Sequence, residues 1–197
     1  MKKKGNILIP VFNESKGIEE FCNLIESVVP TDSYDFTITL IDDGSVDGSW
    51  KIIKNLKSNL MNFRKIKLTR NFGHQSAIFA GLENNEEDFV VIIDADFQDD
   101  PKYIADLINK WELGHKVVLA RKVRRNGEFL KKIYTKIYFK LQNKFTQFTI
   151  PKDVGHYSLI DLSIVKSLSD LPEVNKFLLG LRAFMGSEVG YVDVIKN

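Results

Sequence analysis

The sequence has almost no cysteine and no long apolar run. Cys22 is the only cysteine among 197 residues, so no disulfide can form within the chain, and a reducing compartment is the simplest expectation. No stretch reaches the roughly 18 consecutive apolar residues of a membrane-spanning helix. Residues 1–5 lead directly into an apolar pattern that is too short for the core of a signal peptide. We therefore expect a cytoplasmic location and no membrane-spanning segment.

Two common nucleotide-binding motifs are also absent. The chain contains neither G-x-G-x-x-G nor G-x-x-x-x-G-K-[ST], which removes the main support for a dinucleotide oxidoreductase or a P-loop NTPase. It shows no internal repeat, low-complexity tract or interdomain linker. With 44% apolar and 27% charged residues, residues 1–197 fit one globular domain.

Charge is unevenly distributed along the chain. The segment 115–152 has eleven basic residues and one acidic residue, a net charge of +10, whereas the remainder has 17 basic and 25 acidic residues, a net charge of −8. The overall charge of +2 therefore hides an acidic body with one basic band, which indicates an anionic partner for that band.

Strand and helix patterns alternate through residue 119. Strands are predicted at 6–10, 36–41, 65–68, 89–93 and 117–119, and helices at 18–29, 47–56, 76–83 and 101–111. Continuous Val/Ile runs between helices are typical of an α/β fold with a mostly parallel sheet that is covered on both faces. Ligands of such sheets bind at the carboxyl ends of the strands, and polar clusters follow four of the predicted strands.

One cluster is rich in carboxylates. Asp94 and Asp96 follow an apolar strand, and Gln98 lies two residues further on. Hard divalent cations prefer such oxygen ligands, and Mg²⁺ usually combines one or two carboxylates with substrate phosphates. The alternative is an acidic strand-to-helix loop in which Asp99 or Asp100 caps the helix that begins at Pro101.

Two further clusters follow the first and second strands. Pro10, Phe12 and Glu14 offer an apolar wall and an acceptor, and Asp42 and Asp43 precede a glycine turn. Carboxylates at strand ends commonly bind ribose hydroxyls. The alternative is that Asp42 or Asp43 caps the next helix.

Taken in order, four motifs resemble one family across nearly the whole chain. They are Ile9-Pro-Val-Phe-Asn-Glu14, Leu40-Ile-Asp-Asp-Gly-Ser45, Arg70-Asn-Phe-Gly73 and Ile93-Asp-Ala-Asp-Phe-Gln98. The set is similar to family 2 glycosyltransferases with the GT-A fold, and closest to the branch of dolichyl-phosphate mannose synthases and bacterial polyprenyl-phosphate glycosyltransferases.

The resemblance implies inverting transfer of a sugar from a nucleotide-sugar donor, with Mg²⁺ or Mn²⁺ as cofactor. The nucleotide-sugar-binding residues it implies are Pro10, Phe12, Glu14, Asp42, Asp43, Arg70, Asp94 and Asp96. Asp96 and Gln98 would hold the metal ion.

The acceptor implied by the resemblance is a lipid phosphate or a glycan. Arg121 matches an arginine that grips the lipid phosphate in the related enzymes, with Arg125 and Lys131 as candidates for a second contact and Arg182 as a residue that orders the acceptor region. The branch usually reads Asp-x-Gly-Asp-Phe-x-Leu where this chain has Asp153-Val-Gly-His156-Tyr-Ser-Leu159. We therefore predict catalytic roles for Asp153, His156 and Arg121, and the histidine leaves a lipid phosphate and a glycan both open as acceptors.

The acceptor- and membrane-facing part of the basic band, about 121–150, contains a predicted amphipathic helix at 129–148. Apolar residues repeat at helical spacing while lysines lie beside or opposite them, a pattern that suits the surface of an anionic membrane. An ordinary surface helix with a solvated lysine face is the alternative. Nucleic acid is disfavoured because the band has no recognisable binding motif and the surrounding body is acidic.

Three functions remain open on the sequence alone. They are a glycosyltransferase of cell-envelope polysaccharide or glycolipid synthesis at the inner face of the cell membrane, a nucleotide-sugar-binding module without transfer, and another enzyme of activated sugars such as a nucleotidyltransferase. Related enzymes continue into transmembrane helices, so the chain is expected to be either a short peripheral protein or the soluble part of a longer one. A membrane-protein partner or a homo-oligomer is compatible with both.

Overall fold

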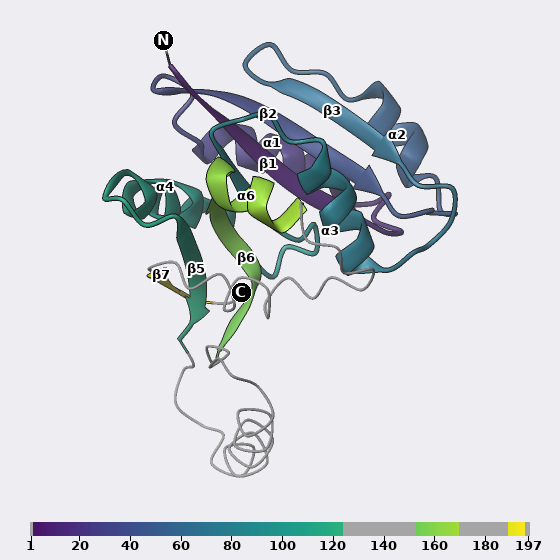
Figure 1. Cartoon of the computed structure of the whole chain (residues 1–197). Coiled ribbons are helices and arrows are strands. Elements are labelled where there is room, and N and C mark those ends of the chain that lie inside the picture. Colours follow the sequence, from purple (N-terminus) through teal and green to yellow (C-terminus); the bar gives the residue numbers. More distant parts are fainter. Residues whose placement is uncertain (1, 124–152, 170–188, 196–197) are drawn as a thin grey trace, which may run out of the picture.

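The structure is a computed structural model that describes residues 2–123, 153–169 and 189–195 (Figure 1). Its strands are β1 (Lys3–Val11), β2 (Tyr34–Asp42), β3 (Asn62–Lys67), β4 (Phe89–Ile92), β5 (Val117–Lys122), β6 (Val154–Asp161) and β7 (Val189–Val194). Its helices are α1 (Ile18–Val28), α2 (Ser49–Asn55), α3 (His74–Glu83), the 3₁₀ turn η1 (Pro101–Tyr103), α4 (Ile104–Glu112) and α6 (Leu162–Ser169). Arg125, Lys131, Arg182 and the predicted basic helix at 129–148 lie outside the described residues.

The described strands form one mixed sheet in the order β3-β2-β1-β4-β6-β5-β7. Parallel pairing joins β1 to β2 and β4, β2 to β3, and β5 to β7, whereas β6 runs antiparallel to both β4 and β5. The predicted mostly parallel α/β sheet is thus confirmed. Because β6 alone runs the other way, its first residues lie at the same edge as the carboxyl ends of the other strands.

Helices cover both faces of the sheet, and alternation along β1 shows why. Ile7 and Ile9 face the apolar core that is closed by α1, α2 and α4, while Leu8 faces the core closed by α3 and α6 (Figure 1). Strands that are buried on both faces need apolar residues at every position, which is the continuous pattern seen in the sequence. Among the residues that the structure describes, no helix is both long and apolar enough to cross a membrane.

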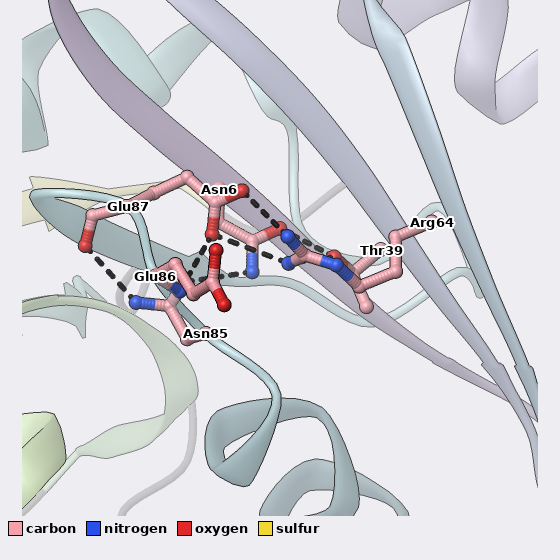
Figure 2. Close-up of polar contacts among 6 residues, drawn as sticks. All are labelled: Asn6, Thr39, Arg64, Asn85, Glu86 and Glu87. Carbon is pink, nitrogen blue, oxygen red and sulfur yellow. Dashed lines mark hydrogen bonds and ion pairs between the residues drawn. The ribbon is translucent and has the colours of Figure 1, made fainter.

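A network of polar side chains connects β1, β2 and β3 to the turn before β4 (Figure 2). Arg64 donates to both carboxylate oxygens of Glu87 at 2.9 and 3.2 Å, and Glu87 is only 6% exposed. The Thr39 hydroxyl donates to Asn6 at 2.7 Å, and the Asn6 amide donates to Asn85 at 2.9 Å. Because these groups pair with one another, the network fixes three strands relative to the α3–β4 turn without leaving a buried charge unpaired.

The sequence placed most elements correctly but not their ends. The helix predicted at 47–56 begins later, at Ser49, with Gly48 as its N-cap, and Asp47 accepts from Ser49 N at 3.0 Å. Of the two candidate caps before Pro101, Asp100 is the one that accepts from Lys102 N, and the helix predicted from Pro101 begins as a 3₁₀ turn. The strand predicted at 65–68 starts earlier, at Asn62.

Candidate functional site

A cleft of about 300 Å³ opens at the carboxyl ends of β1, β2 and β4. Its walls are formed by Pro10, Val11, Phe12, Glu14, Asp43, Asn71, His74, Ala77, Asp94, Ala95 and Asp96. Six of the eight predicted nucleotide-sugar residues are in this set, and they come from three segments far apart in the sequence. Asp42 and Arg70 are the two that are not.

The first wall is held in place by hydrogen bonds between the β1–α1 and β2–α2 loops. Asn13 has a left-handed backbone (φ 58°), and its amide oxygen accepts from Val46 N at 3.0 Å while its N–H donates to Ser45 at 2.9 Å. Glu14 N donates to Ser49 Oγ at 2.9 Å. These contacts fix the turn that presents Phe12, whose side chain is 46% exposed at the cleft.

Asp43 joins two of the cleft's walls. Its carboxylate accepts from Phe72 N at 2.8 Å and Gly73 N at 3.0 Å, so it ties the end of β2 to the loop before α3. Asp42, the last residue of β2, is fully buried and accepts from Ser45 N at 3.2 Å. The cleft is therefore lined by Asp43 and not by Asp42.

Arg70 lies in the same loop as Phe72 but does not line the cleft. Its guanidinium lies 4.3 Å from the centre of the Phe72 ring, and both side chains are exposed. Such a cation–π pair stiffens the loop modestly, by about 0.5–1 kcal/mol at an exposed site. Arg70 is thus positioned beside the cleft rather than within it.

The loop after β4, which carries the predicted metal-binding carboxylate, is shaped by a left-handed turn rather than by strand geometry. Phe97 adopts a left-handed backbone (φ 57°), and its ring packs edge-on against Phe21 of α1, with centroids 5.2 Å apart. Its neighbour Asp96 is exposed at the cleft, and its Oδ1 accepts from Gln98 N at 3.0 Å. The partly buried Phe97 ring anchors the loop to the core, and Asp96 beside it stays exposed.

Asp94 is paired with a residue that the sequence interpretation did not single out. His74, the first residue of α3, lies with Nε2 2.7 Å from Asp94 Oδ1, and its ring centre is 4.7 Å from that of His156 on β6. Gln75 Nε2 in turn lies 3.1 Å from His156 Nε2. The only signal in the sequence was the polar run after the third strand, which says nothing about which carboxylate it meets.

The cleft's electrostatics differ between its two ends. Burial raises the pKa of Glu14, and the neighbouring charges of Asp96 and Asp47 raise it further. Burial also raises the pKa of Asp94, but the hydrogen bond from His74 and the nearby charges of His74, His156 and Lys122 together outweigh burial and hold the pKa below its ordinary value. The same hydrogen bond raises the pKa of His74. At the Glu14–Asp96 end of the cleft, carboxylates lie near one another. At the other end, the Asp94 carboxylate is paired with His74.

The residues predicted for the acceptor side gather at the ends of β5 and β6. Asp153 has a left-handed backbone (φ 61°) and its carbonyl accepts from Lys122 N at 2.8 Å. Arg121 donates through Nε to Asp193 of β7 at 2.7 Å, and both are exposed. His156 is the third residue of β6, and its ring contacts His74. It therefore connects the acceptor side to the cleft.

Lys122 is a second residue that the sequence interpretation did not use in the site. Its ammonium lies 3.4 Å from Asp99 Oδ1, and Asp99 is buried. Burial raises the pKa of Asp99, and the Lys122 charge partly offsets that effect. The ion pair fastens the loop after β4 to the end of β5.

The model of glycosyl transferase family 2 matches residues 6–169, which includes every wall of the cleft. The chain belongs to glycosyl transferase family 2. It is 33% identical over 193 residues to an uncharacterized glycosyltransferase of Bacillus subtilis, YkcC, covering 98% of this chain and 60% of that protein. It is 33% identical over 195 residues to the bactoprenol glucosyl transferase of Shigella phage SfX, covering 98% of this chain and 64% of that protein.

Solved structures share the same fold. The mannosyltransferase PcManGT from Pyrobaculum calidifontis, in complex with GDP-Man and Mn²⁺, gives a TM-score of 0.67 at 18% identity over 100% of this chain and 56% of that one. TarS from S. aureus in complex with UDP-GlcNAc gives 0.64 at 18% identity, over 100% of this chain and 59% of that one. The predicted family and GT-A fold are confirmed, and with them the class of glycosyltransferase. The chain spans about 60% of the length of the relatives it matches.

Proposed function

We propose that the chain is the catalytic domain of an inverting, metal-dependent glycosyltransferase that moves a sugar from a nucleotide-sugar to a polyprenyl phosphate or a glycan in cell-envelope synthesis. The observation that carries the proposal is the convergence of Phe12, Asp43, Asp94 and Asp96 on one cleft at the carboxyl edge of the sheet. Nucleotide ligands of α/β sheets bind at this edge. Relatives named bactoprenol glucosyl transferase support a polyprenyl phosphate as acceptor.

The donor would lie along the cleft from β1 and β2 toward β4. Pro10 and Phe12 offer an apolar surface to the base, Glu14 and Asp43 offer acceptors to the base and ribose, and Arg70 stands at the rim. Asp42 acts only through the turn at Ser45, because it is buried away from the cleft. Asp94, next to β6, would face the sugar end of the donor.

Asp96 and Gln98 fit a Mg²⁺ or Mn²⁺ ion. Both side chains are exposed, and the charge of Asp96 adds to burial in raising the pKa of the nearby Glu14. No three His, Cys, Asp or Glu side chains of the described residues are grouped to hold a metal ion by themselves, so a diphosphate would complete the coordination shell. The bound ion would supply neutralisation of charge on the departing nucleoside diphosphate.

The acceptor would approach from the ends of β5 and β6. Arg121 supplies a positive charge for a phosphate, with Arg125, Lys131 and Arg182 as further acceptor-binding candidates. A phosphate acceptor is already ionised at neutral pH and needs little help from a base. A sugar hydroxyl must lose its proton, and His156 or Asp153 is then the group at the right edge to accept it.

We further propose that residues 121–150 of the basic band bring the domain to the inner face of the cell membrane, where a lipid-linked acceptor is found. The support is its net charge and apolar spacing. Liposome flotation tests this proposal. Binding should require anionic lipid and weaken with salt, and binding that persists when Lys132, Lys136 and Lys140 are reversed to Glu would refute it.

The donor site is tested by a thermal-shift screen of UDP-, GDP-, CMP- and dTDP-sugars with Mn²⁺, with Mg²⁺ and with chelator. A ligand that binds only the folded state stabilises it by about 2.7 kcal/mol at a hundredfold excess over its Kd. We expect a metal-dependent shift with one nucleotide class, and Asp96→Ala should abolish its metal dependence. Donor binding without release of nucleoside diphosphate in the presence of either acceptor would instead favour a binding module without transfer.

A further inference from the structure

His74 stands at the junction between the donor cleft and the acceptor side. It starts α3, yet its side chain meets residues that follow β4 and begin β6, two strands that lie next to each other in the sheet. One edge of its ring hydrogen-bonds to Asp94 at 2.7 Å, and its ring lies 4.7 Å from that of His156. Because a carboxylate can only accept, His74 Nε2 carries the proton of this bond.

We propose that His74 is a positioning residue that fixes the Asp94 carboxylate toward the sugar end of the donor. This inference rests on the proposed glycosyltransferase function. A carboxylate on a loop has free rotamers, and one firm hydrogen bond to a residue on a helix removes that freedom. The Nε2–Oδ1 bond engages one oxygen of Asp94, and both residues line the cleft.

The neighbours of His74 explain why its ring can perform this task. His156 packs against it from β6, and Gln75, the next residue of α3, contacts the His156 ring at 3.1 Å. The imidazole is therefore held on a helix and against a strand, rather than on a loop. Phe12 and Asp43 follow β1 and β2 at the other side of the cleft, so the part of the donor near Asp94 is the part nearest β6 and the acceptor.

Two substitutions separate the hydrogen bond from the ring contact. His74→Gln keeps a side-chain N–H for Asp94 and loses the ring, whereas His74→Phe keeps the ring and loses the N–H. With donor and acceptor identified by the screens above, Kd is measured by calorimetry for the nucleotide-sugar and for its nucleoside diphosphate, and kcat and donor KM are measured by release of nucleoside diphosphate. Asn84→Ala, at the far end of α3, is the matched control.

We expect His74→Phe to weaken nucleotide-sugar binding about tenfold to a hundredfold, the range for losing a hydrogen bond to a charged group, and to lower kcat. Its affinity for the nucleoside diphosphate should stay within about twofold of wild type, and His74→Gln should restore most of the loss. Combined with Asp94→Asn, His74→Phe should add no further loss, because both changes remove the same contact.

Equal effects of His74→Phe and His74→Gln, or equal weakening of both ligands, would overturn the positioning role. The ligand comparison is made on one folded variant, so a general loss of stability does not mimic the expected selectivity. If wild type binds and transfers the sugar but the His74 variants match it, only this inference fails. If wild type binds no nucleotide-sugar, the proposed function fails as well.

Discussion

The close approach of two loops at Gly44 gives a sharp test of how the cleft is built. Gly44 has a left-handed backbone (φ 73°), and a Cβ atom placed there would lie 2.4 Å from the Arg70 carbonyl carbon and 2.6 Å from Asn71 N. Gly48 has a similar backbone (φ 97°), but a Cβ atom there would meet nothing within 4 Å. The two glycines therefore carry the same conformational strain and differ in the clash.

Gly48→Ala should cost about 1–2 kcal/mol, the strain of a left-handed residue with a side chain. Gly44→Ala should cost that amount plus about 1–3 kcal/mol for overpacking against backbone atoms, which cannot rotate away. Urea unfolding of both variants measures the difference. Because Asp43 binds Phe72 N and Gly73 N in the displaced loop, Gly44→Ala should also weaken nucleoside diphosphate binding, and Gly48→Ala should not.

A Gly44→Ala variant no less stable than Gly48→Ala would refute the reasoning, because it would mean that the two loops separate without cost. Unchanged nucleotide affinity in a clearly destabilised Gly44→Ala variant would show that the Asp43 contacts do not shape the cleft. In a chain of this size each kcal/mol lowers Tm by roughly 2–4 °C, so the two variants are distinguishable by heat as well.

Three further outcomes are expected. Asp43→Asn should lower stability by about 1–3 kcal/mol and weaken nucleotide binding, since Phe72 N and Gly73 N donate to different carboxylate oxygens and an amide replaces one of these with an NH₂ donor. Urea unfolding and calorimetry test this, and a stable variant that binds normally would contradict it. Burial raises the pKa of Glu87, but the hydrogen bonds and charge of Arg64, together with backbone N–H donors, outweigh burial and hold the pKa below its ordinary value of 4.5. The pair therefore stabilises the fold above about pH 4.5 and loses this effect as the pH falls through the lowered pKa. The stability gap between wild type and Glu87→Gln should therefore narrow on acidification in urea titrations, and a gap that widens would be inconsistent with it. Burial raises the pKa of the Cys22 thiol to about 12, so it should react with a thiol reagent at pH 8 only after urea unfolds the chain; labelling of the native protein at the rate of a free thiol would disprove its burial.

Local patterns in the sequence were sufficient for the order of elements and for the edge at which the cleft lies. Continuous apolar runs such as 89–93, alternating with helical patterns, predict strands buried on both faces, and a parallel arrangement of such strands brings their polar ends together. This reasoning placed Pro10, Glu14, Asp94 and Asp96 at one edge before any contact was known. The motifs that follow these strands were enough to predict the family.

The sequence by itself thus determined which segments form strands of a mostly parallel sheet and which polar segments follow them. Only the tertiary structure decided which side chains line the cleft: Asp43 does and Asp42 does not, and Arg70 packs against Phe72 beside it. It also paired His74 with Asp94 and His156, from three elements up to 82 positions apart, because β6 enters the sheet antiparallel beside β4. Such contacts depend on the relative placement of distant segments, which no local spacing encodes.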